Sequence, residues 1–240
     1  MSMQTLVIVS HPEIEASNSQ QFLKEAVANQ EGVSYHHLES AYPDGQIDIK
    51  AEQNLLKDFD RIIFQFPFYW YSAPSMLKKW IDEVMEEGVT FGTGGNLLEG
   101  KDLGLVLVIG VAEKEYQVGG REHFTISQLT TPYQALANKL GMTFLTPLSI
   151  FQFYYLSDKE QKLLLVDYLQ IPGYLVDYLQ YLTLKDFSSL HSRAHWFMDQ
   201  LDKVEGRVSE EADKFSLQSI QDFIEDNQLE LDEMQLHLDK

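Results

Sequence analysis

Three loops of this sequence carry side chains that could bind a small molecule, and each loop follows a short apolar run. The first loop, SHPEIEASNSQ at 10–20, offers His11, Ser17 and Asn18 directly before a helical pattern. Backbone N–H groups and the positive end of a helix favour an anion such as a phosphate at a junction of this kind. Serine and asparagine are also ordinary N-cap residues, so this loop alone leaves both interpretations open.

The second loop crowds aromatic rings between two prolines. In FPFYWYSAP at 66–74 the residues concerned are Pro67, Phe68, Tyr69, Trp70 and Tyr71. Rings are hard to bury in a loop, and a flat apolar ligand would account for them. The alternative is that they belong to a hydrophobic core or to a dimer interface. Their position after a buried strand favours a ligand site.

The third loop, GVAEKEYQVGG at 110–120, follows the most apolar run of the chain. Gly110, Gly119 and Gly120 would let the backbone approach the edge of a ring, and Tyr116 offers a hydroxyl group. Ordinary turn formation is the other role that these glycines could have.

The elements that must position these loops alternate between strand and helix patterns. Apolar runs predict five strands, and apolar residues at helical spacing predict helices between them, among them 74–85 and 126–141. The strand runs are 5–9, 33–38, 61–66, 103–110 and 142–151. This alternation predicts an α/β fold with a parallel sheet. The doubly wound, flavodoxin-like order 2-1-3-4-5 would bring all three loops to the carboxyl edge of the sheet.

Charge and composition exclude several classes of function. With 18 Lys and Arg against 37 Asp and Glu, the net charge of −19 disfavours nucleic acids and anionic membrane surfaces as partners. The absence of cysteine excludes disulfides, thiolate nucleophiles and iron–sulfur clusters, and we expect no metal site. No apolar run approaches the ~20 residues of a membrane span and no secretory signal is evident, so we expect a cytoplasmic protein without membrane insertion.

The last part of the chain departs from the strand–helix alternation. LVDYLQIPGY at 165–174 is followed at once by the near-duplicate LVDYLQYLTL at 175–184, and the segment after 199 is rich in acids with apolar residues at helical spacing. We therefore predict one domain over 1–170, whose last helix spans 158–170. Residues 171–240 are predicted as an acidic helical extension that packs on this domain or on a dimer partner.

In order and spacing the three loops resemble the flavodoxin-2 family of NAD(P)H:quinone oxidoreductases. This family includes DT-diaphorase, bacterial modulators of drug activity and the ancillary oxidoreductases of glutathione-gated potassium efflux. The segment PFYWYSAPSMLKKW is similar to the family pattern P-L-x-W-x-x-x-P-A-x-x-K, which backs a flavin ring. The third loop differs, because Val108-Ile109-Gly110-Val111 stands where members usually have T-T-G-G or T-x-G, and backbone donors would have to replace the missing hydroxyls.

The resemblance implies roles for the residues already named. His11, Ser17 and Asn18 would hold the phosphate of a non-covalent flavin, FMN or FAD. The flavin ring would lie against the second and third loops, at Pro67, Phe68, Tyr69, Trp70, Tyr71, Gly110 and Tyr116. Tyr116 aligns with the family's active-site tyrosine, and His123 is a second candidate for proton transfer.

The resemblance also implies a reaction and an assembly. NADH or NADPH would reduce the flavin by hydride transfer, and a quinone-like acceptor would then receive the hydride in ping-pong order. The protein would be a homodimer with the pocket at the subunit interface. The GTGG segment at 92–95 lacks the Lys-Ser/Thr of a P-loop and is predicted as a turn beside the flavin.

Two other functions stay open at this point. The altered third loop and the acidic extension would suit a regulatory or binding subunit, for example of a transporter, with little or no turnover. A single-electron carrier flavodoxin is the other alternative, although the chain length and the aromatic second loop favour an enzyme that transfers hydride.

Overall fold

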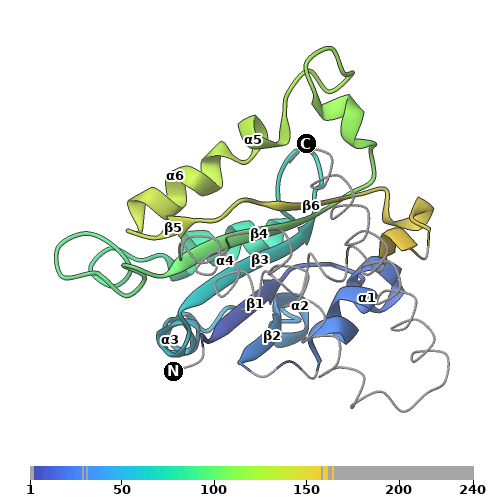
Figure 1. Cartoon of the computed structure of the whole chain (residues 1–240). Helices are drawn as coiled ribbons and strands as arrows, with labels where there is room; N and C mark the ends of the chain where they lie inside the picture. The colour runs from blue at the N-terminus through green and yellow to red at the C-terminus, as the bar shows by residue number, and fades with distance from the viewer. Residues whose placement is uncertain (1–2, 29, 31, 158, 162–163, 165–240) are drawn as a thin grey trace, which may run out of the picture. The chain divides into compact units, whose positions relative to one another are not determined.

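The computed structural model describes residues 3–28, 30, 32–157, 159–161 and 164 (Figure 1). The predictions for the acidic extension over 171–240 lie outside these residues. The same holds for most of the helix predicted over 158–170.

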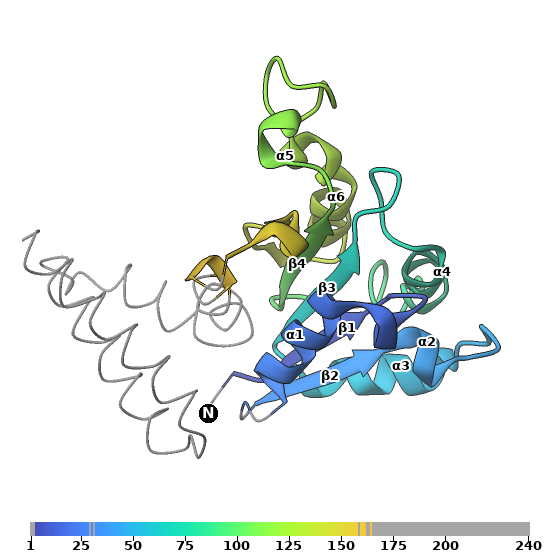
Figure 2. The same ribbon diagram turned by 90° about the vertical axis from the view of Figure 1, so that its right-hand side faces the viewer.

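A parallel sheet forms the centre of the described domain, as predicted (Figures 1 and 2). Its order is β2-β1-β3-β4-β5, and every pair of neighbouring strands is parallel. The four long strands are β1 (Thr5–Val9), β2 (Val33–His37), β3 (Arg61–Pro67) and β4 (Asp102–Ile109). The doubly wound order 2-1-3-4-5 is therefore confirmed.

The fifth strand, predicted as one run over 142–151, is split into two pieces. β5 (Thr143–Phe144) and β6 (Leu148–Phe151) both pair with β4. Leu103 pairs with Phe144 and Val106 pairs with Leu148, so this edge advances four residues while β4 advances three. The extra residue and Pro147, which has no N–H to donate, explain the interruption.

Helices cover both faces of the sheet (Figure 2). α1 (Asn18–Val27) packs on one face, and α3 (Ile49–Leu55), α4 (Ser75–Val84) and α6 (Thr131–Lys139) pack on the other. The short elements are α2 (Leu38–Ala41), α5 (Ile126–Leu129), η1 (Ile14–Ala16), η2 (Leu56–Asp58), η3 (Glu113–Tyr116) and η4 (Phe153–Tyr155).

The single helix predicted over 126–141 is in fact two helices. α5 ends at Leu129 and α6 begins at Thr131, with Thr130 between them at φ −90° and ψ 0°. Pro132 explains the break, because proline is tolerated in the first turn of a helix and disrupts the interior of one.

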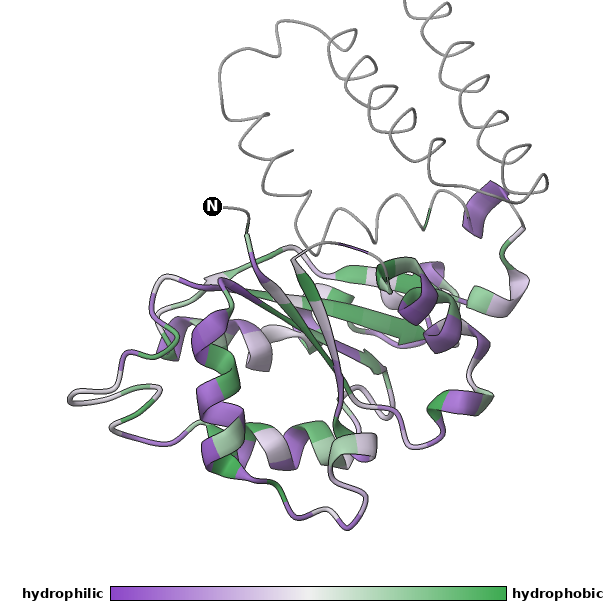
Figure 3. Cartoon of the chain, turned by 90° about the horizontal axis from the view of Figure 1, so that it is seen from below, coloured by the Kyte–Doolittle hydropathy of each residue, from purple (hydrophilic) through white to green (hydrophobic). Residues whose placement is uncertain are grey.

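The core is divided by the sheet into two apolar layers. Successive residues of a strand point to opposite faces, so Leu6 and Ile8 join the layer beneath α3, α4 and α6, while Val7 and Val9 join the layer beneath α1. Trp80 of α4 is the largest fully buried side chain. Because both faces are covered, the inner strands β1, β3 and β4 are mostly apolar (Figure 3).

The glycine-rich turn at 92–95 corrects one prediction. It lies in the connection from α4 to the first residue of β4 and is therefore on the amino side of the sheet, opposite the strand-end loops. The prediction that this turn lies beside the ligand, at the carboxyl edge of the sheet, was therefore wrong. Separately, no helix in the described part of the chain has both the length and the apolar composition that crossing a bilayer requires.

Candidate ligand-binding site at the carboxyl edge of the sheet

A partly buried carboxylate holds the start of the loop that follows β1. Glu39, from α2, accepts hydrogen bonds from the Ser10 hydroxyl at 2.6 Å and from the His11 backbone N–H at 3.1 Å. Burial disfavours the ionised form of Glu39, but hydrogen bonds from His37, Ser10 and the backbone outweigh it and lower its pKa. The carboxylate therefore stays charged and fixes the loop at the point where the chain leaves the sheet.

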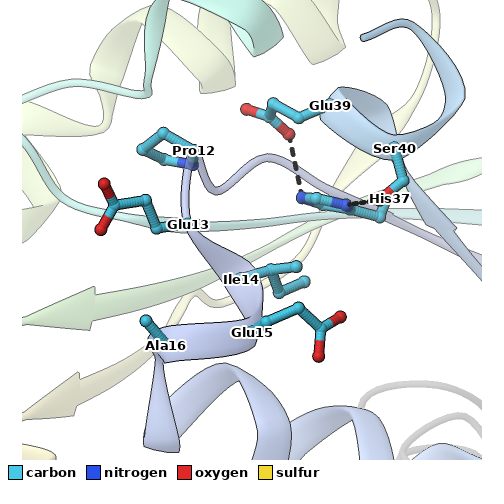
Figure 4. Close-up of a pocket in the computed structure, with 8 residues that line it drawn as sticks. All are labelled: Pro12, Glu13, Ile14, Glu15, Ala16, His37, Glu39 and Ser40. Carbon is cyan, nitrogen blue, oxygen red and sulfur yellow. Dashed lines mark hydrogen bonds and ion pairs between the residues drawn. The ribbon is translucent and has the colours of Figure 1, made fainter.

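His37 completes this cluster with a defined proton arrangement. Its Nε2 lies 3.1 Å from Glu39 Oε2 and 3.0 Å from the His11 carbonyl oxygen. Both neighbours are acceptors, so Nε2 carries the hydrogen, and Nδ1 pairs with the Ser40 hydroxyl at 2.7 Å (Figure 4). The imidazole thus ties the end of β2 to the first loop.

A pocket of about 330 Å³ lies between the first loop and the junction of β2 with α2 (Figure 4). Its lining includes the acidic residues Glu13, Glu15 and Glu39. Three carboxyl groups make this cavity unsuitable for a phosphate, so it is not the anion position that the sequence predicts.

The start of α1, where the sequence predicts an anion, has a different character from this acidic pocket. Ser17 is the N-cap, and its hydroxyl accepts from the Gln20 backbone N–H at 3.4 Å and pairs with the Ser19 hydroxyl at 3.2 Å. Asn18 is the first residue of the helix. The role of Ser17 as a plain N-cap is thus observed, and the first N–H groups of the helix still have no partner within it.

Gln20, in the first turn of α1, carries an unsatisfied donor. Its Oε1 accepts from Gln65 Nε2 at 2.7 Å, but its own Nε2 is fully buried and has no hydrogen-bond partner among the described residues. An unpaired buried donor is costly and rare. At this position it suits a site that a bound polar group completes. His11 would contribute less to the binding of an anion, because burial lowers its pKa and keeps the imidazole neutral.

The aromatic loop after β3 is built around a strained turn. Tyr69 and Ser72 exchange two backbone hydrogen bonds of 3.0 Å, which leaves Trp70 and Tyr71 as the central residues. Both have left-handed backbones, with φ of 48° and 64°. Glycine or asparagine normally occupies such positions, and a bulky residue there costs about 1–3 kcal/mol. Trp70 is 92% exposed, whereas Pro67 and Phe68 are buried.

The loop after β4 brings Tyr116 against the aromatic loop. Its ring centroid lies 6.5 Å from that of Phe68 and 6.1 Å from that of Phe151. Burial first, and then the charge of Glu122 and the neighbouring Tyr71, raise the pKa of Tyr116, so its hydroxyl stays protonated. The second and third loops therefore meet around Tyr116, as the strand order requires.

The structure separates the remaining predicted residues of the third loop. Gly110 is exposed and nothing lies within 4 Å of the position of an added Cβ, so only open space adjoins it. Gly119 has φ 88°, and a Cβ on Gly120 would lie 2.3 Å from the Glu115 carbonyl oxygen, so both serve a turn. His123 is exposed at φ 62°, and its side chain makes no hydrogen bond or ring contact within the described chain.

Several residues that shape this edge were missed by sequence reasoning. Glu39, His37 and Gln20 position the first loop, and Glu122 contacts the second loop from the third. A usable signal existed for Glu39, since a carboxylate just after β2 must lie beside the end of β1 in this strand order. Nothing in the sequence indicated the pairing of Gln20 with Gln65.

Fold and site together define a flavodoxin-like protein with a candidate ligand site at the carboxyl edge of its sheet. Helix N–H groups and an unpaired amide could hold an anion, and exposed rings on the neighbouring loops could contact a flat ligand. Residues 3–168 match the flavodoxin-2 family, whose description is a flavodoxin-like fold, and the chain belongs to this family.

Two curated bacterial relatives illustrate the family. The uncharacterized NAD(P)H oxidoreductase YrkL of Bacillus subtilis (strain 168) is 43% identical over 171 residues, which cover 70% of this chain and 98% of the relative. The glutathione-regulated potassium-efflux system ancillary protein KefG of Cronobacter sakazakii is 38% identical over 146 residues, covering 61% of this chain and 79% of the relative.

Two solved structures are similar in fold and sequence. An NADPH-quinone reductase from P. pentosaceus has a TM-score of 0.67 and 44% identity, covering 71% of this chain and 98% of that one. The general stress protein 14 of Treponema denticola, solved in complex with FMN, has a TM-score of 0.64 and 29% identity, covering 69% and 95%. The family match ends at residue 168, so the acidic extension has no counterpart in it.

Proposed function

We propose that this protein is a flavin-dependent oxidoreductase that reduces quinone-like acceptors with NADH or NADPH. One observation carries the proposal: the start of α1, with its unpaired Gln20 amide, and the exposed aromatic loop occur on adjacent strand ends of one sheet edge. The similarity to a NADPH-quinone reductase at 44% identity supports the choice of reaction.

The residues at this edge fit a flavin. Ser17, Asn18 and the N–H groups at the start of α1 would hold its phosphate, with His11 as a neutral neighbour. The rings of the second loop and the open space at Gly110 would accommodate the isoalloxazine. Hydride exchange in ping-pong order is the chemistry that a bound flavin would supply. The FMN complex of a relative supports FMN, and FAD stays the alternative.

The chain's own groups would position the acceptor and supply protons. Tyr116 is the residue we assign to the acceptor, because its raised pKa keeps the hydroxyl a hydrogen-bond donor beside the aromatic loop. His123 stays the second candidate for proton transfer. It is exposed, and its side chain makes no hydrogen bond or ring contact in the described chain.

A homodimer is part of this proposal. The exposed rings of Tyr69, Trp70 and Tyr71 gather on one loop, and exposed aromatic residues in contact loops are typical of interfaces between subunits. A second copy of the chain would cover these rings and enclose the ligand. Light scattering on the purified protein should give twice the 27.7 kDa mass of one chain. The expectation of a cytoplasmic location accords with a nicotinamide nucleotide as reductant.

One experiment tests the reaction. The purified protein is examined for a flavin spectrum before and after incubation with FMN or FAD, and oxidation of NADH and NADPH is then followed with menadione as acceptor. We expect a yellow protein that turns over with at least one nucleotide. A protein that stays colourless after reconstitution with either flavin contradicts the proposal.

A regulatory role is the second candidate, and the 38% identity to KefG, an ancillary protein of a potassium-efflux system, favours it specifically. In that case the protein would bind a flavin and act mainly through a transporter subunit. The same experiment separates the two functions, because a yellow protein without menadione-dependent turnover supports the ancillary role.

A further inference from the structure

A hydrogen bond between side chains joins the second loop to the third. The Tyr71 hydroxyl donates to Glu122 Oε2 at 2.8 Å, across 51 positions of sequence. Within the described chain it is the only side-chain hydrogen bond between residues 68–74 and 110–124. One donor and one acceptor thus form the polar side-chain link between the two loops, in addition to the ring contact of Phe68 with Tyr116.

The donor lies in a backbone conformation that needs support. Tyr71 has φ 64° and follows Trp70 at φ 48°, and bulky residues keep such conformations only where surrounding contacts fix them. The ring of Trp70 is almost entirely exposed in this structure and provides little such contact. Glu122 thus supplies one side-chain anchor of the turn, at Tyr71, while the Tyr133 hydroxyl accepts from the Ala73 backbone N–H at 3.2 Å on the other side.

The bond also adjoins Tyr116. The Tyr116 ring packs against Phe68, at the start of the loop that Tyr71 belongs to, and the charge of Glu122 contributes to the raised pKa of both tyrosines. His123, the next residue along the chain, makes no comparable contact in the described structure.

We propose that Glu122 is a positioning residue of this site, because its carboxylate latches Tyr71 and so holds the Trp70–Tyr71 turn beside Tyr116. This inference rests on the proposed oxidoreductase function. The latch would fix the wall of the pocket against which the acceptor binds. Its loss should weaken acceptor binding more than it slows the reaction of bound acceptor.

Two variants break the latch and two serve as controls. Glu122→Ala removes the acceptor, and Tyr71→Phe removes the donor while keeping the ring. Glu122→Gln keeps an oxygen that can accept from Tyr71. Glu113→Ala removes the same charge from an exposed position of the same loop, in η3, whose side chain makes no hydrogen bond or ion pair in the described chain.

Two measurements are made on each variant. Amide hydrogen exchange over residues 68–74 is followed in the flavin-free protein, and kcat and KM for menadione are measured after reconstitution with FMN. We expect Glu122→Ala and Tyr71→Phe to speed exchange and to raise the KM for menadione about three- to tenfold, with kcat nearly unchanged. Glu122→Gln should lie close to the unmodified protein, and the double variant Tyr71→Phe/Glu122→Ala should be no worse than either single one.

The outcomes separate this inference from the proposed function. If Glu122→Ala matches Glu113→Ala in both measurements, the latch is wrong whether or not the enzyme turns over. If the unmodified protein binds no flavin or has no turnover, the oxidoreductase assignment fails and takes the role in acceptor binding with it. Exchange in the flavin-free protein still decides whether the Tyr71–Glu122 contact holds the turn.

Discussion

Two regions of this protein both contain a glutamate, a histidine and a tryptophan, but these residues have different roles in the two regions. In the region beneath α4, Glu52 of α3 accepts hydrogen bonds from His36 at 2.9 Å, Tyr42 at 2.5 Å and Trp80 at 2.8 Å. At the carboxyl edge, Glu39 binds His37, and Trp70 stands nearly free in solvent. His36 and His37 are neighbours on β2 and point to opposite faces, so one strand serves both regions.

The two regions differ in how completely their groups are satisfied. Trp80 is 0% exposed and its indole N–H has a partner, whereas Trp70 is 92% exposed on a strained backbone. A region whose polar atoms are paired and whose rings are buried stabilises the fold. A region that keeps strain, exposed rings and an unpaired amide is where ligand binding is expected, since functional sites depart from the rules that folding favours.

The largest effect should come from the buried carboxylate beneath α4. Glu52→Ala would leave three donors in a site where Glu52 itself is only 2% exposed, and we expect the free energy of unfolding in urea to fall by about 3–5 kcal/mol. Asn54→Ala, at an exposed position of the same helix, should change it by less than about 0.5 kcal/mol. If the two variants lowered the free energy of unfolding equally, the region beneath α4 would have no special role in stability.

The same carboxylate should make stability depend on pH. Burial disfavours its ionised form, but hydrogen bonds from His36, Tyr42 and Trp80 outweigh burial and hold the pKa of Glu52 below the ordinary 4.5. The unfolded chain therefore takes up a proton first, and stability is lost as the pH falls from about 4.5 through the lower folded pKa. Glu52→Gln should lower stability at neutral pH and flatten this acid loss.

Urea unfolding between pH 7 and pH 3.5 measures this dependence. Glu25→Gln, an exposed carboxylate of α1, is the matched control and should keep the acid slope of the unmodified protein. If Glu52→Gln keeps that slope too, the hydrogen bonds beneath α4 do not favour the ionised carboxylate.

At the carboxyl edge, loss of the carboxylate should affect binding more than stability. Glu39→Ala releases the Ser10 hydroxyl and the His11 backbone N–H, and we expect the Kd for FMN to rise about tenfold, as for the loss of one to two hydrogen bonds. Removing a negative charge near a phosphate should by itself lower the Kd. Glu13→Ala, which removes an exposed charge from the same loop, is therefore the control, and should leave the Kd equal or lower.

Fluorescence titration of the flavin-free variants with FMN gives both constants. A Kd for Glu39→Ala at or below that of Glu13→Ala would show that the cluster around Glu39 does not position the first loop. The carboxyl edge would then not be distinguished from the region beneath α4 by a role of its carboxylate in ligand binding.

The sequence predicted the fold from its strand runs, because a sheet covered on both faces needs continuous apolar residues and the connecting helices have a different period. It did not predict the break at Thr130 or the interruption before β6, since both depend on single residues within otherwise regular patterns. The three loops were correctly predicted to follow neighbouring strands. Partners such as Glu39 for Ser10 and Glu122 for Tyr71 are 29 and 51 residues apart, and local patterns do not carry such pairings.

The smallest expected effect separates the backbone of the exposed tryptophan from its ring. Trp70→Ala and Trp70→Gly both remove a ring that is almost entirely exposed. Only glycine adopts the left-handed backbone at φ 48° without strain. We expect Trp70→Gly to be more stable than Trp70→Ala by about 1 kcal/mol in urea unfolding, since the relief exceeds the entropy that glycine loses on folding. Both variants should bind FMN less tightly than the unmodified protein. A glycine variant that is no more stable than the alanine one would mean that the turn stores no strain, and Trp70 would then differ from Trp80 in exposure alone.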